Sequence, residues 1–331
     1  MCDNWRVSAG SDPAPTRMLP PGVSFVAVQW VDLQGRAKAR LVPRSGWPAT
    51  CAPGGGVPVH GGLVAIPDPS TLVVLPTRPH IAIAYATLHD GERVAGCDAR
   101  AILARVQARA AEGGPLPVAG LRPRFALAPF DEHGVGDPRD DLGSLLRASP
   151  LLAAVVAAAQ GLDWQVDELA HEEAPGTFAI GLSETDALRA ADRFALLRTV
   201  VADVASGHGM TAAFGPGLRV RLSAFADIGA FAAGLRHHAH ALSALTTGGH
   251  AQSAVRRGGD WVQVGPVDGA ANPYLVLAGL VAAGLDGIDR ALDGDAAEPS
   301  LSPAGALAAL QADAVLRDAL GDEAVGALRS S

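Results

Sequence analysis

The stretch Gly120-Leu121-Arg122-Pro123-Arg124-Phe125-Ala126-Leu127 alternates apolar and charged side chains. Successive side chains of a β-strand point to opposite faces. The large apolar residues therefore share one face, and Arg122 and Arg124 share the other. The pattern returns further along the chain in Leu218-Arg219-Val220-Arg221-Leu222-Ser223. We predict two half-buried strands, each with a pair of guanidinium groups on one face.

The sequence around these two stretches predicts further strands and helices. Asp98 is a candidate N-cap for a helix, and so is Ser183, whose partner in a capping box would be Asp186. Pro150 predicts a kink or break in its helix, and the Gly- and Pro-rich segment 45–62 predicts a long loop. Further strands are predicted at 23–31, 36–42, 72–75, 80–88, 164–169, 177–182, 211–214 and 261–264. Helices are predicted at 98–112, 142–160, 183–207, 228–245 and 272–292, followed by one or two Ala-rich helices.

These elements predict an α+β fold in two domains. Residues 1–21 are polar and Pro-rich and predict a loose N-terminal segment. Residues 22–95 predict a small, largely β N-terminal domain. Residues 96–331 predict a larger domain in which helices cover antiparallel strands.

The composition excludes some classes of function. The net charge of −8 offers no basic surplus for binding nucleic acid. Lys38 is the one lysine among 26 basic residues, so arginine is the default cation of this chain. Cys2, Cys51 and Cys97 suit neither a disulfide framework nor a metal site. With no signal pattern and no apolar run long enough to span a bilayer, we expect a soluble cytoplasmic protein that contacts no membrane.

Several motifs keep one order along most of the chain. The N-terminal ones are the hairpin turn at 31–36, the Pro-Asp-Pro-Ser-Thr segment at 67–71 and Asp98-Ala99-Arg100. Ala190-Ala191-Asp192-Arg193 and the helix 231–245 follow. The most specific is Asp268-x-x-x-Asn272-Pro273-Tyr274-Leu275 with Ala-Gly-Leu-Asp-Gly-Ile at 283–288. Together these motifs resemble the glutamine synthetase family. The resemblance is closer to the branch that uses amines and polyamines, and it implies a β-grasp-like N-terminal domain before a glutamine synthetase-like catalytic-type domain.

The resemblance also implies a chemistry, and this chain departs from it at the metal ligands. Family members phosphorylate a carboxylate with ATP and let an amine displace the phosphate, with Mg²⁺ held by glutamates and a histidine. Here Arg122-Pro123-Arg124 stands for the family's Glu-x-Glu strand, and Arg219-Val220-Arg221 stands for its His-x-His strand. Of the second acidic motif only Glu172 is kept. Because a divalent cation beside four arginines would be repelled, we expect neither Mg²⁺ nor ATP as a cofactor and assign no catalytic residue and no metal ligand.

Two interpretations remain for the arginines. Arg122, Arg124, Arg219, Arg221 and Arg256 could line an anion pocket, because arginine forks suit phosphate and carboxylate. Alternatively, they are a solvated sheet face in an arginine-rich protein. Glu172 is either a remnant metal ligand or, as we favour, an ion-pair partner of these arginines.

Histidines offer weaker candidates. His171 beside Glu172 is a candidate general base. A zinc site is one interpretation of the group His237, His238 and His240, with His250 further on. Because the sequence shows no converging set of three or four ligands, we favour a packing role.

Three functions follow. The first is a glutamine synthetase-like protein without ATP-dependent carboxylate–amine ligase activity, a pseudoenzyme that acts through a partner or within a biosynthetic pathway. The second is an enzyme of altered chemistry that holds an anionic substrate in an arginine-lined cavity. The third is a retained glutamate–amine ligase. The family forms rings, so the expected partners are copies of this chain, an active paralogue or a small anion.

Overall fold

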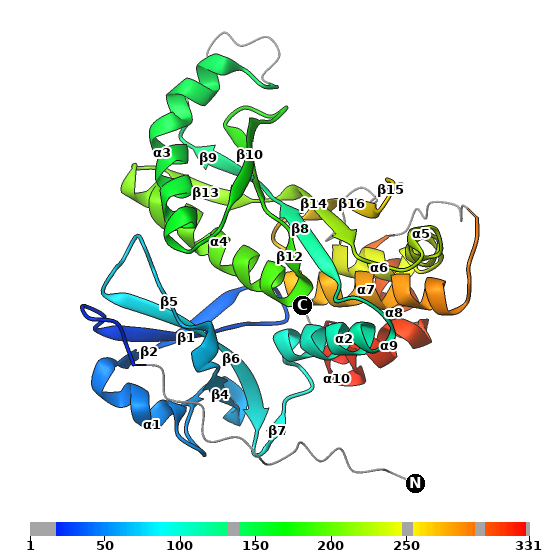
Figure 1. The fold of residues 1–331 in the computed structure, drawn as a ribbon, viewed down its shortest axis with the longest axis horizontal. Helices are drawn as coiled ribbons and strands as arrows, with labels where there is room; N and C mark the ends of the chain where they lie inside the picture. The colour runs from blue at the N-terminus through cyan, green and yellow to red at the C-terminus, as the bar shows by residue number, and fades with distance from the viewer. Residues whose placement is uncertain (1–17, 131–138, 247–253, 295–301, 329–331) are drawn as a thin grey trace.

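A computed structural model describes residues 18–130, 139–246, 254–294 and 302–328. Three sheets and the helices that pack on them form the fold (Figure 1). One sheet belongs to the N-terminal part of the chain and the other two to the remainder. This arrangement confirms the predicted α+β class, while the domain boundaries after residues 21 and 95 stay predictions.

The N-terminal sheet is built around β6. Its strand order is β2-β1-β6-β4-β3, and β5 and β7 also pair with β6. β1 and β2 form the predicted hairpin, in which Gly35 has a φ of +79°. The strands are β1 Phe25–Val31, β2 Ala37–Pro43, β3 Val57–Pro58, β4 Val64–Pro67, β5 Val73–Val74, β6 Ile81–Asp90 and β7 Arg93–Val94.

The other two sheets meet where the opening stretch of the sequence crosses between them. One has the order β12-β8-β14-β16-β15 and the other β10-β11-β9-β13. The strands are β8 Val118–Arg122, β9 Arg124–Ala128, β10 Val166–His171, β11 Thr177–Leu182, β12 Thr185–Asp186, β13 Thr211–Phe214, β14 Pro216–Ser223, β15 Ala254–Arg257 and β16 Trp261–Asp268.

The helices cover these sheets and end the chain. They are α1 Trp47–Cys51, α2 Ala99–Gly113, α3 Leu142–Gly161, α4 Ala187–Gly207, α5 Ile228–His237, α6 Ala239–Thr246, α7 Pro273–Asp289, α8 Pro303–Ala312, α9 Ala314–Leu320 and α10 Asp322–Ala327. Short 3-10 turns lie at Arg44–Gly46, His60–Gly62 and Pro69–Thr71. α7 is buried along nearly its whole length and packs against α2, α4, α5 and α9.

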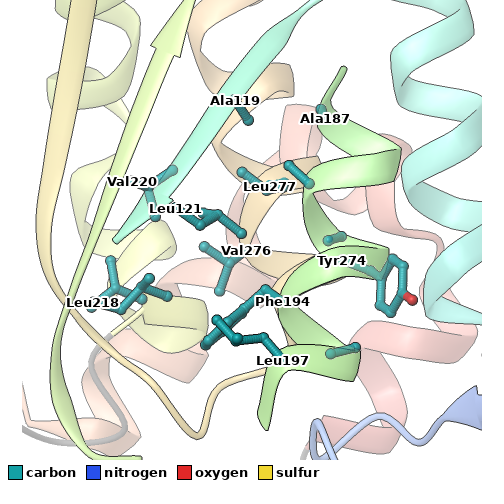
Figure 2. Packing of buried hydrophobic residues seen from close by; sticks show 14 of the residues in the cluster. Ala119, Leu121, Ala187, Phe194, Leu197, Leu218, Val220, Tyr274, Val276 and Leu277 are labelled. Atoms are coloured by element: carbon teal, nitrogen blue, oxygen red, sulfur yellow. The ribbon is translucent and has the colours of Figure 1, made fainter. Parts of the chain in front are cut away.

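The largest core lies between the β8–β14 sheet and the helices α4 and α7. Figure 2 shows Leu121 of β8 and Val220 of β14 on the side that faces Phe194 of α4 and Val276 of α7. These side chains are fully or almost fully buried. The apolar half of the predicted alternation is therefore confirmed in both arginine-bearing strands.

The structure corrects the prediction of one strand through Gly120–Leu127. Pro123 divides it, because a proline has no N–H to donate to a ladder. β8 pairs with β14, whereas β9 pairs with β11 and β13. Arg122 and Arg124 therefore belong to different sheets.

Other corrections concern helix ends and loops. The cap of α4 is Asp186, whose carboxylate accepts from the Arg189 N–H, and not Ser183. The predicted helix 228–245 is two helices, α5 and α6. The segment 45–62 contains α1, and three helices follow residue 301 instead of one or two. Pro150 lies inside a helix that continues through it.

The motifs shared with the family converge on one buried ion pair that joins the N-terminal sheet to the rest. The Arg100 guanidinium donates to both oxygens of Asp192, each at 2.9 Å. Tyr274 Oη donates to Asp192 Oδ1 at 2.7 Å, and Tyr85 Oη donates to the Asp192 carbonyl at 2.8 Å. Burial lowers the pKa of Arg100, but the hydrogen bond to Asp192 outweighs it and raises this pKa. We call Arg100, Asp192, Tyr85 and Tyr274 the Asp192 joint.

A second contact holds the same parts together. Asn272 caps α7 with its side-chain oxygen and donates through Nδ2 to the Asp32 carbonyl at 2.8 Å. Arg198 Nη2 donates to the Gly35 carbonyl at 2.6 Å. A Cβ on Gly35 would lie 2.7 Å from the Ala270 carbonyl oxygen, so only glycine fits this turn.

Among the described helices, α3 alone is long and apolar enough to cross a membrane by length and composition. It packs against α4 and β10 and buries Leu151, Leu152 and Val155. A core helix of a globular protein meets the same test, so this helix is weak evidence for a membrane span.

Candidate functional site

The two arginine-bearing strands lie side by side in one sheet. β8 and β14 are antiparallel, with Arg122 opposite Arg219 and Gly120 opposite Arg221. Arg256 lies on β15 opposite Gln263 of β16, which in turn lies opposite Arg221. The structure thus brings the predicted arginines to neighbouring strands.

Arg122 is held by two glutamates. Its Nε and Nη2 donate to the two oxygens of Glu168 at 2.8 and 2.7 Å. Its Nη1 donates to Glu172 Oε1 at 2.6 Å. The hydrogen bonding between Arg122 and Glu168 raises the pKa of the Arg122 guanidinium and lowers the pKa of the Glu168 carboxyl. Arg219 contributes to the lowered pKa of Glu168 through its charge.

Arg124 takes the second oxygen of Glu172. Its Nε lies 3.3 Å from Glu172 Oε2. Its aliphatic part lies against Gly217, where a Cβ would overlap the Arg124 Cδ, and Gly217 has a φ of +128°. A glycine at the start of β14 therefore makes room for the arginine on β9.

Arg221 lies at the wetter end of the surface. Its Nε is 3.0 Å from Glu184 Oε1, and its guanidinium lies over the Trp261 ring at 4.8 Å from the centroid. Arg219 and Arg256 are exposed and make no ion pair within the described residues. We call Arg122, Arg124, Arg219, Arg221, Glu168, Glu172 and Glu184 the arginine face.

The arginine face does not fit a divalent metal ion. Its four guanidinium groups meet three carboxylates, and both oxygens of the buried Glu172 already contact arginine. Mg²⁺ needs several free oxygen ligands in near-octahedral geometry. Within the part of the chain that the structure describes, no three His, Cys, Asp or Glu side chains converge as a metal site. The donor set suits holding the chain together or contacting anions.

The predicted partner role of Glu172 is confirmed by these contacts. The binding of an anion by Arg122, Arg124, Arg219, Arg221 and Arg256 stays a prediction. His171 is buried with its ring 5.0 Å from that of Phe178.

Of the predicted histidine group, His238 forms an ion-pair cluster with two aspartates. His238 is buried, with Nδ1 2.6 Å from Asp313 Oδ2 and Nε2 3.0 Å from Asp286 Oδ2. The Asp286 carboxylate also accepts from Arg290. Burial lowers the pKa of His238, but these two carboxylates outweigh it and raise this pKa. His238 ties α5 to α7 and to the cap of α9, while His250 lies outside the described residues.

Sequence reasoning missed two of the three acids of the arginine face. Glu168 was read only as part of a strand, and Glu184 as part of the first turn of α4. Both lie within a few residues of a predicted strand end, but nothing local marks them as partners of residues 46 and 37 positions away. The pairing of β10 with β11 and of β11 with β9 brings Glu168 into reach, and the pairing of β12 with β8 and of β8 with β14 does so for Glu184.

Comparison with known proteins decides the family. The model of the glutamine synthetase catalytic domain matches residues 96–224 and 256–329, which is well over half of the chain. The chain belongs to the glutamine synthetase family. The solved structure of a GmaS/ADP complex superposes with a TM-score of 0.86 at 26% identity, covering 93% of this chain and 92% of that one.

Relatives in the glutamine synthetase family include enzymes that act on different amines. A glutamine synthetase of Rhizobium meliloti is 27% identical, covering 82% of this chain and 80% of its own length. A glutamate–methylamine ligase of Methyloversatilis universalis is 26% identical, with coverages of 90% and 89%. A gamma-glutamylpolyamine synthetase of Streptomyces coelicolor is 28% identical, with coverages of 91% and 87%. The last alignment spans 409 residues against 331 in this chain, so the relative carries internal segments that this chain lacks.

Proposed function

We propose that this chain is a member of the glutamine synthetase family without metal-dependent, ATP-driven carboxylate–amine ligase activity. Its arginine face would hold the sheets together with fixed guanidinium charges where the family's pattern places metal ligands. The protein would act through binding, either to an active relative or to another component of a biosynthetic pathway.

The observation that carries the proposal is the state of Glu172. It is the one acid kept from the second acidic motif, and it is buried with Arg122 at 2.6 Å and Arg124 at 3.3 Å. A carboxylate that is already neutralised by two cations has little attraction left for a third. Both arginines stand where the family's pattern has the glutamates of its Glu-x-Glu strand.

The direct test is ATP turnover. The purified chain would be incubated with ATP, glutamate, either Mg²⁺ or Mn²⁺, and ammonium, methylamine or putrescine in turn. We expect no release of phosphate that depends on both metal and glutamate. A glutamine synthetase assayed in parallel confirms the conditions. Phosphate release that rises with glutamate and stops on adding EDTA would contradict the proposal and support a retained ligase.

A variant designed to gain metal binding tests separately whether Arg122 and Arg124 are what keeps a metal ion away from Glu172. Replacing both arginines, Arg122→Glu with Arg124→Glu, places new carboxylates beside Glu172. We expect Mn²⁺ binding to appear in calorimetry or electron paramagnetic resonance. The control pair, Arg122→Gln with Arg124→Gln, removes the positive charges without adding acids and should bind Mn²⁺ less tightly. Equal Mn²⁺ binding by the unaltered chain and the glutamate pair would overturn the argument.

A second candidate is an enzyme of altered chemistry that holds an anionic substrate. The exposed Arg219 favours it, because this residue makes no ion pair in the described part of the chain and lies directly opposite Arg122. Titration with inorganic phosphate tests it. Binding that is lost in Arg219→Ala and kept in Arg236→Ala would support this candidate, whereas binding that is unaffected by Arg219→Ala would remove its basis.

The partner role has its own measurement. Mass photometry of the chain alone reports whether copies assemble. Mixing with an active glutamine synthetase from the same source then reports a mixed assembly. A chain that stays monomeric in both experiments would leave the binding role without support.

A further inference from the structure

A cavity of about 550 Å³ lies away from the arginine face. It is lined by α2, α7 and α9 and by the loop between β14 and α5, and no residue of the arginine face lines it. Figure 1 places α2 and α9 next to α7, in agreement with their packing contacts. The volume falls in the range of small-molecule sites, which is about 300–1,000 Å³.

The walls of the cavity are mostly apolar. Val106 and Ala110 of α2 and Ala282 and Leu285 of α7 line it. Phe225 closes one side and stacks on Phe231 with ring centroids 3.8 Å apart. Such a surface suits an apolar body of small size.

The loop beside Phe225 holds an unusual backbone. Ala224 lines the cavity and has a φ of +68°, a left-handed conformation that costs energy for any residue with a Cβ. This conformation lies in the turn between β14 and the aromatic wall. The strain is therefore located at the cavity and not at a solvent-exposed loop tip.

The charged side chains of the cavity are three aspartates and two arginines, Arg105 and Arg109. α2 and α7 both reach it with their last residues, Gly113 and Asp289. The C-terminus of a helix carries a partial negative charge, and neither helix has a basic residue in its last turn. Asp286, Asp289 and Asp318 add three carboxylates to this surface.

Most of the charges at the cavity already have partners. Asp286 accepts from Arg290 and lies 3.0 Å from His238. Asp318 pairs with Arg109, and Arg105 donates to the Ala319 carbonyl at 2.8 Å. Asp289 makes no ion pair with any residue that the structure describes. A ligand would therefore meet the Asp289 carboxylate at a helix C-terminus, and on another wall Arg105, which donates to a backbone carbonyl and pairs with no carboxylate among the described residues.

We propose that this cavity binds a small amphipathic cation, with its apolar body against Phe225 and Leu285 and its protonated amine at Asp289. An anion of the same shape would face Asp289 and the helix C-termini, so charge and not shape alone selects the ligand. The site is separate from the arginine face, and its occupancy needs neither ATP nor metal.

Calorimetric titration of the full chain at pH 7 tests the proposal with three probes of similar shape. These are phenethylamine as the cation, 2-phenylethanol as the neutral molecule and 3-phenylpropionate as the anion. We expect phenethylamine to bind about two- to fivefold more tightly than 2-phenylethanol, which is the range for an exposed charge pair. The anion should bind most weakly. Equal binding of the three probes, or no binding of phenethylamine at millimolar concentration, would overturn the proposal.

Variants locate the site. Asp289→Asn changes an exposed residue and should weaken phenethylamine binding about two- to fivefold while leaving 2-phenylethanol binding unchanged. Ala282→Leu fills the apolar part and should abolish binding of both probes. Glu112→Gln alters another exposed acid in the last turn of α2, which does not line the cavity, and should change nothing. Since Asp289→Asn involves no core packing, unaltered phenethylamine affinity in this variant would sink the proposal even if Ala282→Leu fails to fold.

Discussion

The Asp192 joint and the arginine face both consist of arginines paired with carboxylates, but they differ in their contact with solvent. In the joint the Arg100 and Asp192 side chains are 14% and 9% exposed. On the arginine face the centre is similarly shielded, with Arg122 16% and Glu172 11% exposed, but at its edge the exposed fraction reaches 50% for Glu168 and 45% for Arg221. Motifs shared with the family meet at the first region, whereas the residues that depart from the family's pattern lie at the second.

This difference in exposure gives a reason why the Asp192 joint matches the family's sequence pattern and the arginine face departs from it. A buried carboxylate must keep its cation, because an uncompensated charge in the interior is costly. Side chains that reach water can be exchanged for others, provided that the local charges still balance. On the arginine face three arginines pair with three glutamates, and the exposed Arg219 makes no ion pair among the described residues. A retained fold and an altered site are therefore compatible in one chain.

The largest expected effect comes from removing the acid of the joint. Asp192→Ala leaves Arg100 buried without a carboxylate, so we expect a loss of about 3–5 kcal/mol in the free energy of unfolding. Urea denaturation followed by circular dichroism measures it. Asp203→Ala, which breaks the exposed pair with Arg78, is the matched control and should cost far less. Similar losses in the two variants would erase the distinction between buried and exposed pairs.

On the arginine face the largest effect should come from Glu172. Glu172→Gln removes the charge that holds Arg122 and Arg124, and we expect a loss of about 2–3 kcal/mol, as for hydrogen bonds to charged groups. The measurement is again the free energy of unfolding. The neighbouring Glu173→Gln, an exposed residue, should leave stability unchanged. A stable Glu172→Gln variant would show that the face contributes nothing to folding.

A third prediction uses pH, because the joint relies on arginine, which does not titrate, whereas the His238 cluster does. The pKa of His238 is raised in the folded chain, so its contribution is full below about pH 6.5 and is lost as pH rises through the folded-state pKa. His238→Gln should cost about 1–2 kcal/mol at pH 6 and flatten the decline above it. The control His60→Gln changes an exposed histidine and should keep the wild-type pH profile.

Asp313 extends this prediction to acid. Burial raises the pKa of its carboxyl, but the hydrogen bond with His238 and the other contacts outweigh burial and lower it. Its contribution is therefore present above about pH 3.8 and is lost as pH falls through the lowered pKa. A stability curve that rises steadily from pH 6 to pH 8 would contradict the assignment of His238.

The smallest effect is expected at Arg221. Its side chain is 45% exposed, so losing the pair with Glu184 and the contact with Trp261 in Arg221→Ala should cost less than about 1 kcal/mol. Thermal unfolding resolves a change of this size. A loss as large as that of Glu172→Gln would mean that the exposed edge of the face is as important as its buried centre.

Much of the fold could be predicted from local patterns. Alternation identified β14 and the buried face of β8, and Asp98 was recognised as the cap of α2. Asn272-Pro273-Tyr274 marked the start of α7. Such features depend on neighbours within a few residues, which the sequence displays directly.

The remainder depends on contacts between distant segments. The alternation around Pro123 predicts one continuous strand. Because Pro123 has no N–H to donate, the chain instead forms β8 before it and β9 after it, in two different sheets. Asp186 and Ser183 are both suitable caps, and only the short strand Thr185–Asp186 that precedes α4 decides between them. The charge partners of the arginine face lie on β10 and after β11, so no local signal could assign Glu168 or Glu184.

The double contact of Glu172 also restricts the mutational paths open to this chain. Changing Arg122 alone to glutamate would strip Glu168 and Glu172 of their shared cation and add a third carboxylate beside them. The single variant Arg122→Glu would be destabilised, because one new carboxylate does not yet complete a metal site whose bound ion could stabilise it. A metal-holding surface at this position of the fold would therefore require several substitutions at once.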